Sequence, residues 1–297
     1  MNKFLAVLGV TVAAAVAAPD EPWENLPDGS TGQVTEFHGV DGLAIPAYMR
    51  KPKGDGPFPI VILAHGGVYG KPQTLGMGRS QKSPTEDFIQ AGWAVYSVDY
   101  RPAEKIAVHP IEFDDTVEAV KAVRKLPFVD PQRVGYIGGS HGAQVGARVV
   151  SRIDLSGAIL CAPAAMDLVE DKKAIAHGEK LVGVLSRMIA DLEKQYGATL
   201  EEVDKDRKKY GYSSPIDEAA QVRCPLLIVN GKADDNSPVS IIDIYVNRLR
   251  AAGKKVETYL PDNMPHGFYF GRPEGPEYHE CARLSVAFLR KCFQMAP

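Results

Sequence analysis

The feature that most constrains this chain is the segment Val-Gly-Tyr-Ile-Gly-Gly-Ser-His-Gly-Ala at residues 134–143. Residues that prefer β-strands run into Gly-Gly-Ser-His-Gly, and a helical pattern up to Arg152 follows at once. Gly138 and Gly142 match the G-x-S-x-G spacing of a nucleophile elbow, in which strand and helix backbones pass so closely that small residues are needed. The pattern predicts that Ser140 lies at the apex of a strand-turn-helix. A glycine-rich turn with a chance serine would show the same spacing.

Continuous apolar runs recur along the chain and are typical of strands buried on both faces of a parallel sheet. They occupy residues 59–64, 94–98, 133–137, 157–161 and 225–229, and a more polar edge strand follows at 255–260. Earlier, residues 33–37 and 43–50 flank Gly39-Val40-Asp41-Gly42, a hairpin signal that predicts two antiparallel strands.

Helical patterns lie between these strands, at residues 83–91, 111–126, 143–152, 239–252 and 277–293. Strand and helix alternate over about 200 residues, which is typical of the α/β class. We therefore expect a mostly parallel sheet of about eight strands with helices on both faces.

Residues 164–213 break this alternation, because they contain no strand pattern. Leu181, Leu185, Met188 and Leu192 recur at helical spacing, and Thr199-Leu200-Glu201-Glu202 matches a capping box that opens a second, charged helix. The stretch is longer than an ordinary connection in such folds. We predict a helical lid whose apolar face covers an acyl pocket; a surface helical hairpin is the alternative.

Residues with useful chemistry follow four of the predicted strands. Gly67 lies in a glycine loop that begins at His65, Ser140 follows the third parallel strand, Asp234 follows residues 225–229, and His266 follows residues 255–260. Ligands of α/β sheets bind at the carboxyl ends of the strands, so we expect these groups on one rim.

Three of these motifs carry a family resemblance: Gly-Gly-Ser-His-Gly, Gly-Lys-Ala-Asp-Asp and Pro-His-Gly-Phe. The chain resembles the α/β-hydrolase superfamily, and within it the prolyl-oligopeptidase-like and dienelactone-hydrolase-like serine esterases. The resemblance covers residues 33–297 and preserves the order Ser, Asp, His. Dienelactone hydrolases carry a cysteine nucleophile, whereas this chain has Ser140. A mature chain of about 280 residues has no room for the large propeller of the oligopeptidases, so we expect an ester substrate rather than an oligopeptide.

The resemblance and the chemistry together assign catalytic roles. We expect Ser140 to be the nucleophile, and His266 to remove its proton and later to protonate the leaving group. Asp234, which follows Gly231 at the G-x-x-D spacing of these enzymes, would orient the histidine. Asp235 is the second choice for this role, with capping of the next helix as its simpler explanation.

The oxyanion of the reaction needs backbone donors. We predict the N–H groups of His141 and Gly67, with Val68 as the less favoured alternative to Gly67. Tyr69 and Phe268 are predicted to line the substrate pocket, although aromatic residues in such loops often serve only in packing. No cluster has metal-ligand spacing, so we expect neither a metal nor a cofactor.

The first residues are typical of a secretory signal peptide. Lys3 precedes an uncharged run that ends in alanines, and Ala15-Val16-Ala17 supplies a cleavage pattern. The expected division is a signal peptide at 1–17, an extended arm at 18–32 and a hydrolase domain at 33–297. The run is shorter than the about 20 residues of a membrane span. We expect a secreted or periplasmic protein without stable membrane association.

The net charge limits the expected binding partners, and the cysteine positions limit the possible disulfide bonds. The formal net charge is −3 and no basic block occurs, so nucleic acid is not an expected partner. Cys281 and Cys292 fall in one predicted helix, about 16 Å apart along its axis, too far to bridge. Together with Cys161 and Cys224, they are predicted to be free, buried thiols.

The predicted function is secreted hydrolysis of carboxylic esters through an acyl-enzyme. The resemblance implies short-chain acyl or aryl esters, such as acetyl or feruloyl groups on polysaccharide. A serine aminopeptidase or acylaminoacyl-type peptidase shares the same catalytic residues and is the alternative enzyme. A non-catalytic binding protein of the same fold is the alternative of a different class.

Overall fold

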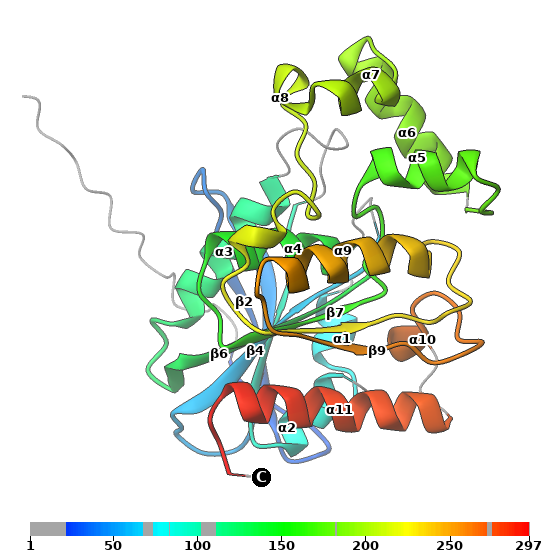
Figure 1. Cartoon of the computed structure of the whole chain (residues 1–297). Coiled ribbons are helices and arrows are strands. Elements are labelled where there is room, and N and C mark those ends of the chain that lie inside the picture. The colour runs from blue at the N-terminus through cyan, green and yellow to red at the C-terminus, as the bar shows by residue number, and fades with distance from the viewer. Residues whose placement is uncertain are drawn as a thin grey trace, which may run out of the picture.

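A computed structural model describes residues 22–67, 74–82, 84–101, 111–181, 183–271 and 275–296. Figure 1 shows a twisted central sheet with helices on both faces. The nine described strands follow the order β1-β2-β3-β5-β4-β6-β7-β8-β9, and the pairs from β5 to β9 are parallel. They are β1 (Glu24–Asn25), β2 (Thr31–His38), β3 (Ala44–Lys51), β4 (Phe58–Ala64), β5 (Ala94–Val98), β6 (Val129–Gly139), β7 (Gly157–Cys161), β8 (Leu226–Val229) and β9 (Val256–Tyr259).

The antiparallel part lies at the amino-terminal edge, as the hairpin signal predicts. β2 and β3 pair along their full lengths, and Gly42 has a positive φ of 82° in the turn between them. Within the expected arm at 18–32, Glu24–Asn25 forms β1 against β2, and β2 itself begins at Thr31. A two-residue strand is too short to produce a readable alternation.

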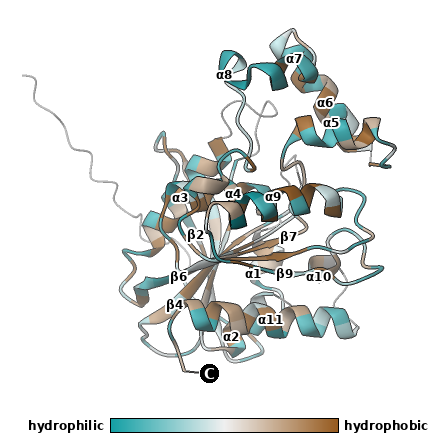
Figure 2. Ribbon diagram, viewed as in Figure 1, coloured by the Kyte–Doolittle hydropathy of each residue, from teal (hydrophilic) through white to brown (hydrophobic). Residues whose placement is uncertain are grey.

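Strand β4 shows why the parallel strands read as continuous apolar runs. Ile60 and Ile62 face one hydrophobic core, whereas Val61 and Leu63 face the other. Alternate side chains point to opposite faces of a sheet, so a strand covered on both faces must be apolar at every position. In Figure 2 the central strands are accordingly coloured as apolar.

Two helical layers cover the sheet. In Figure 1, α3, α4 and α9 lie on one face and α2 and α11 on the other. The described helices are α1 (Thr74–Gly78), α2 (Thr85–Gln90), α3 (Ile111–Val123), α4 (His141–Arg152), α5 (Leu168–Ala176), α6 (Gly183–Tyr196), α7 (Leu200–Lys205), α8 (Arg207–Tyr210), α9 (Val239–Ala251), α10 (Phe268–Gly271) and α11 (Pro276–Cys292), with a 3-10 turn at Ala219–Gln221.

The inserted segment is helical, as predicted, and projects beyond the α4 and α9 layer (Figure 1). Thr199 and Glu202 form the expected capping box at the start of α7. The apolar face of α6, however, contributes Leu185, Met188 and Leu192 to a separate small core shared with α5 and α7. The expectation that this face covers an acyl pocket is therefore wrong, because these side chains are already buried against α5 and α7.

The cysteines are free thiols, with Cys161, Cys224 and Cys281 buried and Cys292 half-buried. Burial raises the pKa of the Cys281 thiol well above its ordinary 9.0, which keeps it protonated and unreactive. Within the described part of the chain, no helix has the length and apolar character needed to cross a membrane.

Candidate active site

Ser140 stands between β6 and α4 in a strained backbone conformation, with φ 53° and ψ −117°. Its N–H donates to the carbonyl of Cys161 at the end of β7, at 2.8 Å, and its own carbonyl accepts from the N–H of Ala143 at 3.0 Å. These bonds fix the turn from both sides. The side chain therefore lies at the carboxyl edge of the sheet, as the sequence predicts.

The flanking glycines are required by close backbone contacts. A Cβ on Gly142 would lie 2.5 Å from the carbonyl oxygen of His65 and closer still to that of Ala64. A Cβ on Gly138 would lie 2.8 Å from the amide nitrogen of Ala143. Real Cβ atoms do not approach backbone atoms this closely, so any side chain would force strand and helix apart.

Ser140, His266 and Asp234 form one hydrogen-bonded series across three loops. The Nε2 atom of His266 lies 2.8 Å from Ser140 Oγ, and its Nδ1 atom lies 2.9 Å from Asp234 Oδ2. The Asp234 side chain is fully buried, whereas the histidine ring is 23% exposed. A carboxylate on Nδ1 selects the tautomer whose Nε2 can accept the serine proton.

Backbone bonds hold the acid in place. Asp234 Oδ1 accepts from the N–H groups of Asn236 and Ser237, both at 2.8 Å. The loop after β8 is joined to the loop after β9 by a bond from the Ala233 N–H to the carbonyl of Met264, at 3.1 Å. Asp235 is exposed and lies outside this series. The structure thus brings together the first-choice acid and not the second.

The glycine loop after β4 is tethered through His65. Its ring is buried and stacks on Tyr100, with centroids 4.4 Å apart, and the Tyr100 hydroxyl donates to the carbonyl of His65 at 2.6 Å. His65 Nδ1 lies 2.9 Å from the carbonyl of Gly66. His65 therefore supports the loop, as expected, and leaves Gly67 exposed with a positive φ of 95°.

His141 is the first residue of α4, so its N–H has no partner four residues earlier in the helix. Its buried ring points away from Ser140 and His266, and its Nε2 atom lies 3.3 Å from Glu112 Oε1. Glu112 is 1% exposed, at the start of α3. The His141 ring is thus a structural group, and its backbone N–H is the part available to a ligand.

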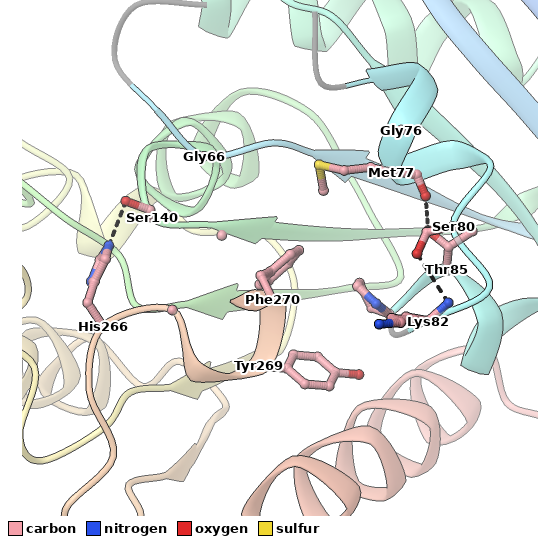
Figure 3. A pocket seen from close by; sticks show the side chains of 13 residues that line it. Gly66, Gly76, Met77, Ser80, Lys82, Thr85, Ser140, His266, Tyr269 and Phe270 are labelled. Carbon is pink, nitrogen blue, oxygen red and sulfur yellow. Dashed lines mark hydrogen bonds between the residues drawn. The ribbon is translucent and has the colours of Figure 1, made fainter. Parts of the chain in front are cut away.

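A cavity of about 550 Å³ opens beside Ser140, within the range of small-molecule sites. One wall comes from the α1–α2 region and contributes Met77, Ser80 and Lys82, and the other comes from α10 (Figure 3). The Phe270 ring lies against Gly139, where an added Cβ would approach it to 2.9 Å. In Figure 3 this ring separates Ser140 from Lys82.

The two predicted pocket residues have different outcomes. Phe268 does not line the cavity: it is 4% exposed and packs in the core, with its ring 6.5 Å from that of Tyr259. In its place Tyr269 and Phe270 face the cavity, because successive residues of a helical turn point in different directions. Tyr69 and Val68 lie outside the described residues.

The wall residues Met77, Ser80, Lys82, Pro84 and Thr85 were missed by sequence reasoning. This segment has neither a catalytic motif nor a clear periodicity. Only the fold brings it to the carboxyl edge of the sheet, where α1 contacts β3 and β5. Among the described residues, no group of His, Cys, Asp and Glu side chains has an arrangement that could hold a metal ion.

Comparisons with known proteins agree with this architecture. Residues 91–296 match the sequence profile of the prolyl oligopeptidase family. Esterase EstD of Thermotoga maritima is 25% identical over 258 residues, covering 81% of this chain and 62% of the esterase. Dipeptidyl aminopeptidase BIII of Pseudoxanthomonas mexicana is 24% identical over 261 residues, covering 81% of this chain and 34% of that enzyme.

A solved structure shares the fold over nearly its whole length. It is a Klebsiella pneumoniae protein assigned as a dienelactone hydrolase, with a TM-score of 0.62 at 16% identity. The match covers 90% of this chain and 99% of that one. The α/β-hydrolase fold predicted from the sequence is thereby confirmed. By contrast, the chain spans only 34% to 62% of the length of three relatives that it matches in sequence, Esterase EstD and dipeptidyl aminopeptidase BIII among them.

Proposed function

This chain belongs to the prolyl oligopeptidase family of serine hydrolases, and from that premise we propose that it hydrolyses carboxylic esters through an acyl-enzyme on Ser140. The observation that carries the proposal is the series Ser140–His266–Asp234, hydrogen-bonded at 2.8 and 2.9 Å beside a cavity. Such a series is what a serine needs in order to act as a nucleophile.

Acylation would begin when Ser140 Oγ attacks the ester carbonyl and His266 Nε2 takes the hydroxyl proton. The imidazolium is stabilised by the buried Asp234 carboxylate on Nδ1. The tetrahedral oxyanion would accept hydrogen bonds from the N–H groups of His141 and Gly67, each worth about 10²–10³ in rate. The same imidazolium then protonates the leaving alcohol, and the acyl group stays on Ser140.

Deacylation repeats these steps with water as the nucleophile. His266 removes a proton from the water, the second tetrahedral intermediate collapses, and the proton returns to Ser140 Oγ. The products are a carboxylic acid and an alcohol, and the free enzyme is regenerated. No step requires a metal or a redox cofactor.

The cavity supports ester over aminopeptidase substrates. An aminopeptidase or dipeptidyl aminopeptidase, as one relative is named, acts on a chain whose free amino terminus is an ammonium group. A carboxylate in the pocket would suit that group, but none of the described residues lining this cavity is Asp or Glu. Small acyl or aryl esters, including acetyl or feruloyl groups on polysaccharide, need no such acid.

A substrate panel tests this proposal. Values of kcat/KM would be compared for p-nitrophenyl esters of increasing chain length, a feruloyl ester, acetylated xylan and aminoacyl anilides. The proposal predicts turnover of at least one ester class and much slower cleavage of the anilides. Anilides cleaved faster than every ester would favour the peptidase. No turnover of any kind, together with no labelling of Ser140 by a fluorophosphonate, would favour a binding protein.

We also propose that the protein is exported and cleaved after Ala17, from the cation, apolar run and Ala-x-Ala pattern at the amino terminus. These residues lie outside the described part of the chain. Expression in a bacterial host with a secretion system, followed by mass measurement of the amino-terminal peptide, checks the proposal. A cytosolic product that retains Met1 or residues 2–17 would contradict it.

A further inference from the structure

We infer that the substrate carries a carboxylate group, which Lys82 binds on the side of the cavity away from Ser140. The inference rests on the proposed esterase function and narrows its substrates to anionic esters.

Hydrogen bonds connect the backbone around Lys82 to its neighbours and to the sheet. The Lys82 N–H donates to Ser80 Oγ at 3.1 Å, and its carbonyl accepts from the N–H of Glu86 at 3.2 Å. The neighbouring carbonyl of Ser80 accepts from Arg50 Nη1 at 2.6 Å. Arg50 is fully buried in β3, so this bond ties the wall to the central sheet.

A second bond ties the two helices of this wall together, from Thr85 Oγ1 to the carbonyl of Met77 at 2.8 Å (Figure 3). The exposed side chain of Lys82 therefore projects from a backbone that is hydrogen-bonded to its neighbours. A side chain presented in this way loses less entropy when it binds a ligand than one on a mobile loop.

The charges around this wall leave Lys82 as the cation that faces the cavity. Among the described residues that line the cavity, Lys82 is the only one with an amine or a carboxyl group. The other titratable groups of this lining are the His266 imidazole and the Tyr269 hydroxyl. Two nearby acids pair with arginines: Glu86 lies 2.9 Å from Arg50, and Glu24 lies 2.8 Å from Arg79. A third, Asp87, accepts a hydrogen bond from the hydroxyl of the lining residue Tyr269 at 3.4 Å. Lys82 is consequently the full positive charge that the described lining contributes at neutral pH.

The two ends of the cavity carry different groups, one for ester cleavage and one for carboxylate binding. Ser140 and His266 stand at one end, Lys82 stands at the other, and the Phe270 ring lies between them (Figure 3). An ester whose apolar middle contacts Phe270 and Met77 could place its carbonyl at Ser140 and its carboxylate at Lys82. The carboxylate could belong to the acyl part or to the alcohol part of such an ester.

Two matched pairs of esters separate these sources. The acyl pair is the p-nitrophenyl hemiester of glutaric acid and its neutral methyl-ester form. The alcohol pair is 4-carboxyphenyl butyrate and 4-carbamoylphenyl butyrate. For the wild-type protein we expect kcat/KM to favour the anionic member of one pair by roughly fivefold, the worth of a partly exposed ion pair. The preference should lie in KM, because Lys82 is remote from the reacting atoms.

The variants are Lys82→Met, Lys82→Arg and Lys82→Glu. Lys82→Met should bring the anionic-to-neutral ratio close to one, Lys82→Arg should keep it, and Lys82→Glu should reverse it. The matched control is Lys125→Met, an exposed lysine beyond α3 near the start of β6, at the opposite edge of the sheet. The wild-type preference should also shrink as salt is added.

The outcomes distinguish this inference from the function on which it rests. Neutral esters hydrolysed as well as anionic ones in both pairs would overturn the Lys82 inference and leave the esterase intact. A preference that survives in Lys82→Glu would overturn it as well. If no ester in either pair is hydrolysed while aminoacyl anilides are, the proposed function has failed and the inference fails with it.

Discussion

At Ser140 the backbone occupies a conformation that costs about 1–3 kcal/mol for a residue with a side chain. The surrounding bonds hold this strain in place: the Ser140 N–H is fixed to Cys161, and Gly138 and Gly142 admit the close backbone contacts. The strain places Oγ 2.8 Å from His266 Nε2. At the scale of single residues, the site is therefore specified by backbone geometry as much as by the reacting groups.

Asp234→Asn should lower the acylation rate far more than Asp235→Asn. The Asp234 carboxylate is fully buried against His266 Nδ1, whereas Asp235 is exposed. Loss of the orienting acid costs about 10⁴ in the best-studied serine protease. Pre-steady-state release of p-nitrophenol measures the step directly. Equal losses in the two variants would overturn the assignment of Asp234.

Gly142→Ala should destabilise the protein by about 1–3 kcal/mol, because the new methyl group would meet the backbone carbonyl oxygens of residues 64 and 65. Gly183→Ala is the matched control, since no atom lies within 4 Å of its added Cβ and alanine favours a helix. Urea titration of both variants checks the difference. A Gly142→Ala protein as stable as the control would show that the elbow tolerates a side chain.

Motif residues at this scale could be read from the sequence, but pocket residues could not. Ser140 and Asp234 each follow an apolar strand, and His266 follows the more polar edge strand β9, so their shared edge was predictable. Phe268 was chosen wrongly because Phe268-Tyr269-Phe270 gives no sign of which ring faces the core. Lys82 was missed because only the tertiary fold carries its segment to the catalytic edge.

At the scale of elements, the insertion is a unit with its own core, joined to the domain by a charged network. Arg207 lies 2.7 Å from Asp167 and 2.8 Å from Asp217. Asp167 is 1% exposed and also accepts from the Tyr212 hydroxyl at 2.9 Å. Sequence periodicity predicted these helices and the capping box, but amphipathicity alone cannot say which neighbour an apolar face will cover.

Arg207→Ala should loosen the insertion without affecting the site, because it leaves the buried Asp167 carboxylate without its cation. A cost of about 2 kcal/mol would raise cleavage by thermolysin within residues 164–213 by roughly 30-fold. Arg223→Ala is the control, since its contact with Asp154 is long, 3.9 Å, and exposed. Unchanged proteolysis in Arg207→Ala would show that the network contributes nothing to the docking of the insertion.

Whether the insertion acts as a lid remains a proposal, and shortening it is the test. None of the described residues lining the cavity comes from 164–213. If the insertion nevertheless governs entry, a folded deletion variant should accept longer acyl chains and change KM, while the smallest acetyl ester keeps a similar kcat. A deletion variant with the parent chain-length profile would contradict the lid.

At the scale of the whole molecule, buried acids make stability depend on pH. Asp171 in α5 is 1% exposed, and its Oδ2 atom has no hydrogen-bond partner among the described residues. Burial, and then the charges of Asp167, Glu170 and Glu179, raise the pKa of the Asp171 carboxyl well above its ordinary 3.8. At a pH between the unfolded and the folded pKa, the folded protein therefore keeps a proton on Asp171 that the unfolded chain loses.

The sign of this effect follows from the raised pKa. Below the unfolded value of 3.8 both states are protonated, and Asp171 carries no penalty. As the pH rises from there, each unit costs about 1.4 kcal/mol of stability until the folded pKa is reached. Asp171→Asn should remove the penalty and raise the Tm, by about 1.6 °C per kcal/mol, and over the range from about pH 4 to pH 7 the gain should grow until the folded pKa is reached.

Scanning calorimetry across this pH range checks the effect, with Asp191→Asn, on an exposed position of α6, as the control. A gain for Asp171→Asn that stays the same at every pH would contradict the account. The overall α/β architecture was predictable from the sequence because central strands such as β4, β7 and β8 are continuous apolar runs that alternate with helical patterns. The protonation of Asp171 was not, because it depends on burial within the insertion core.

The most direct measurement of the central claim is the mass of the acyl-enzyme. The protein would be mixed with a p-nitrophenyl ester, quenched in acid within the burst of p-nitrophenol release, and digested for peptide mass analysis. We predict one acyl adduct per chain on the peptide that contains Ser140, and neither burst nor adduct in Ser140→Ala. Ester turnover that persists in Ser140→Ala, or an adduct on a different residue, would contradict the proposed mechanism.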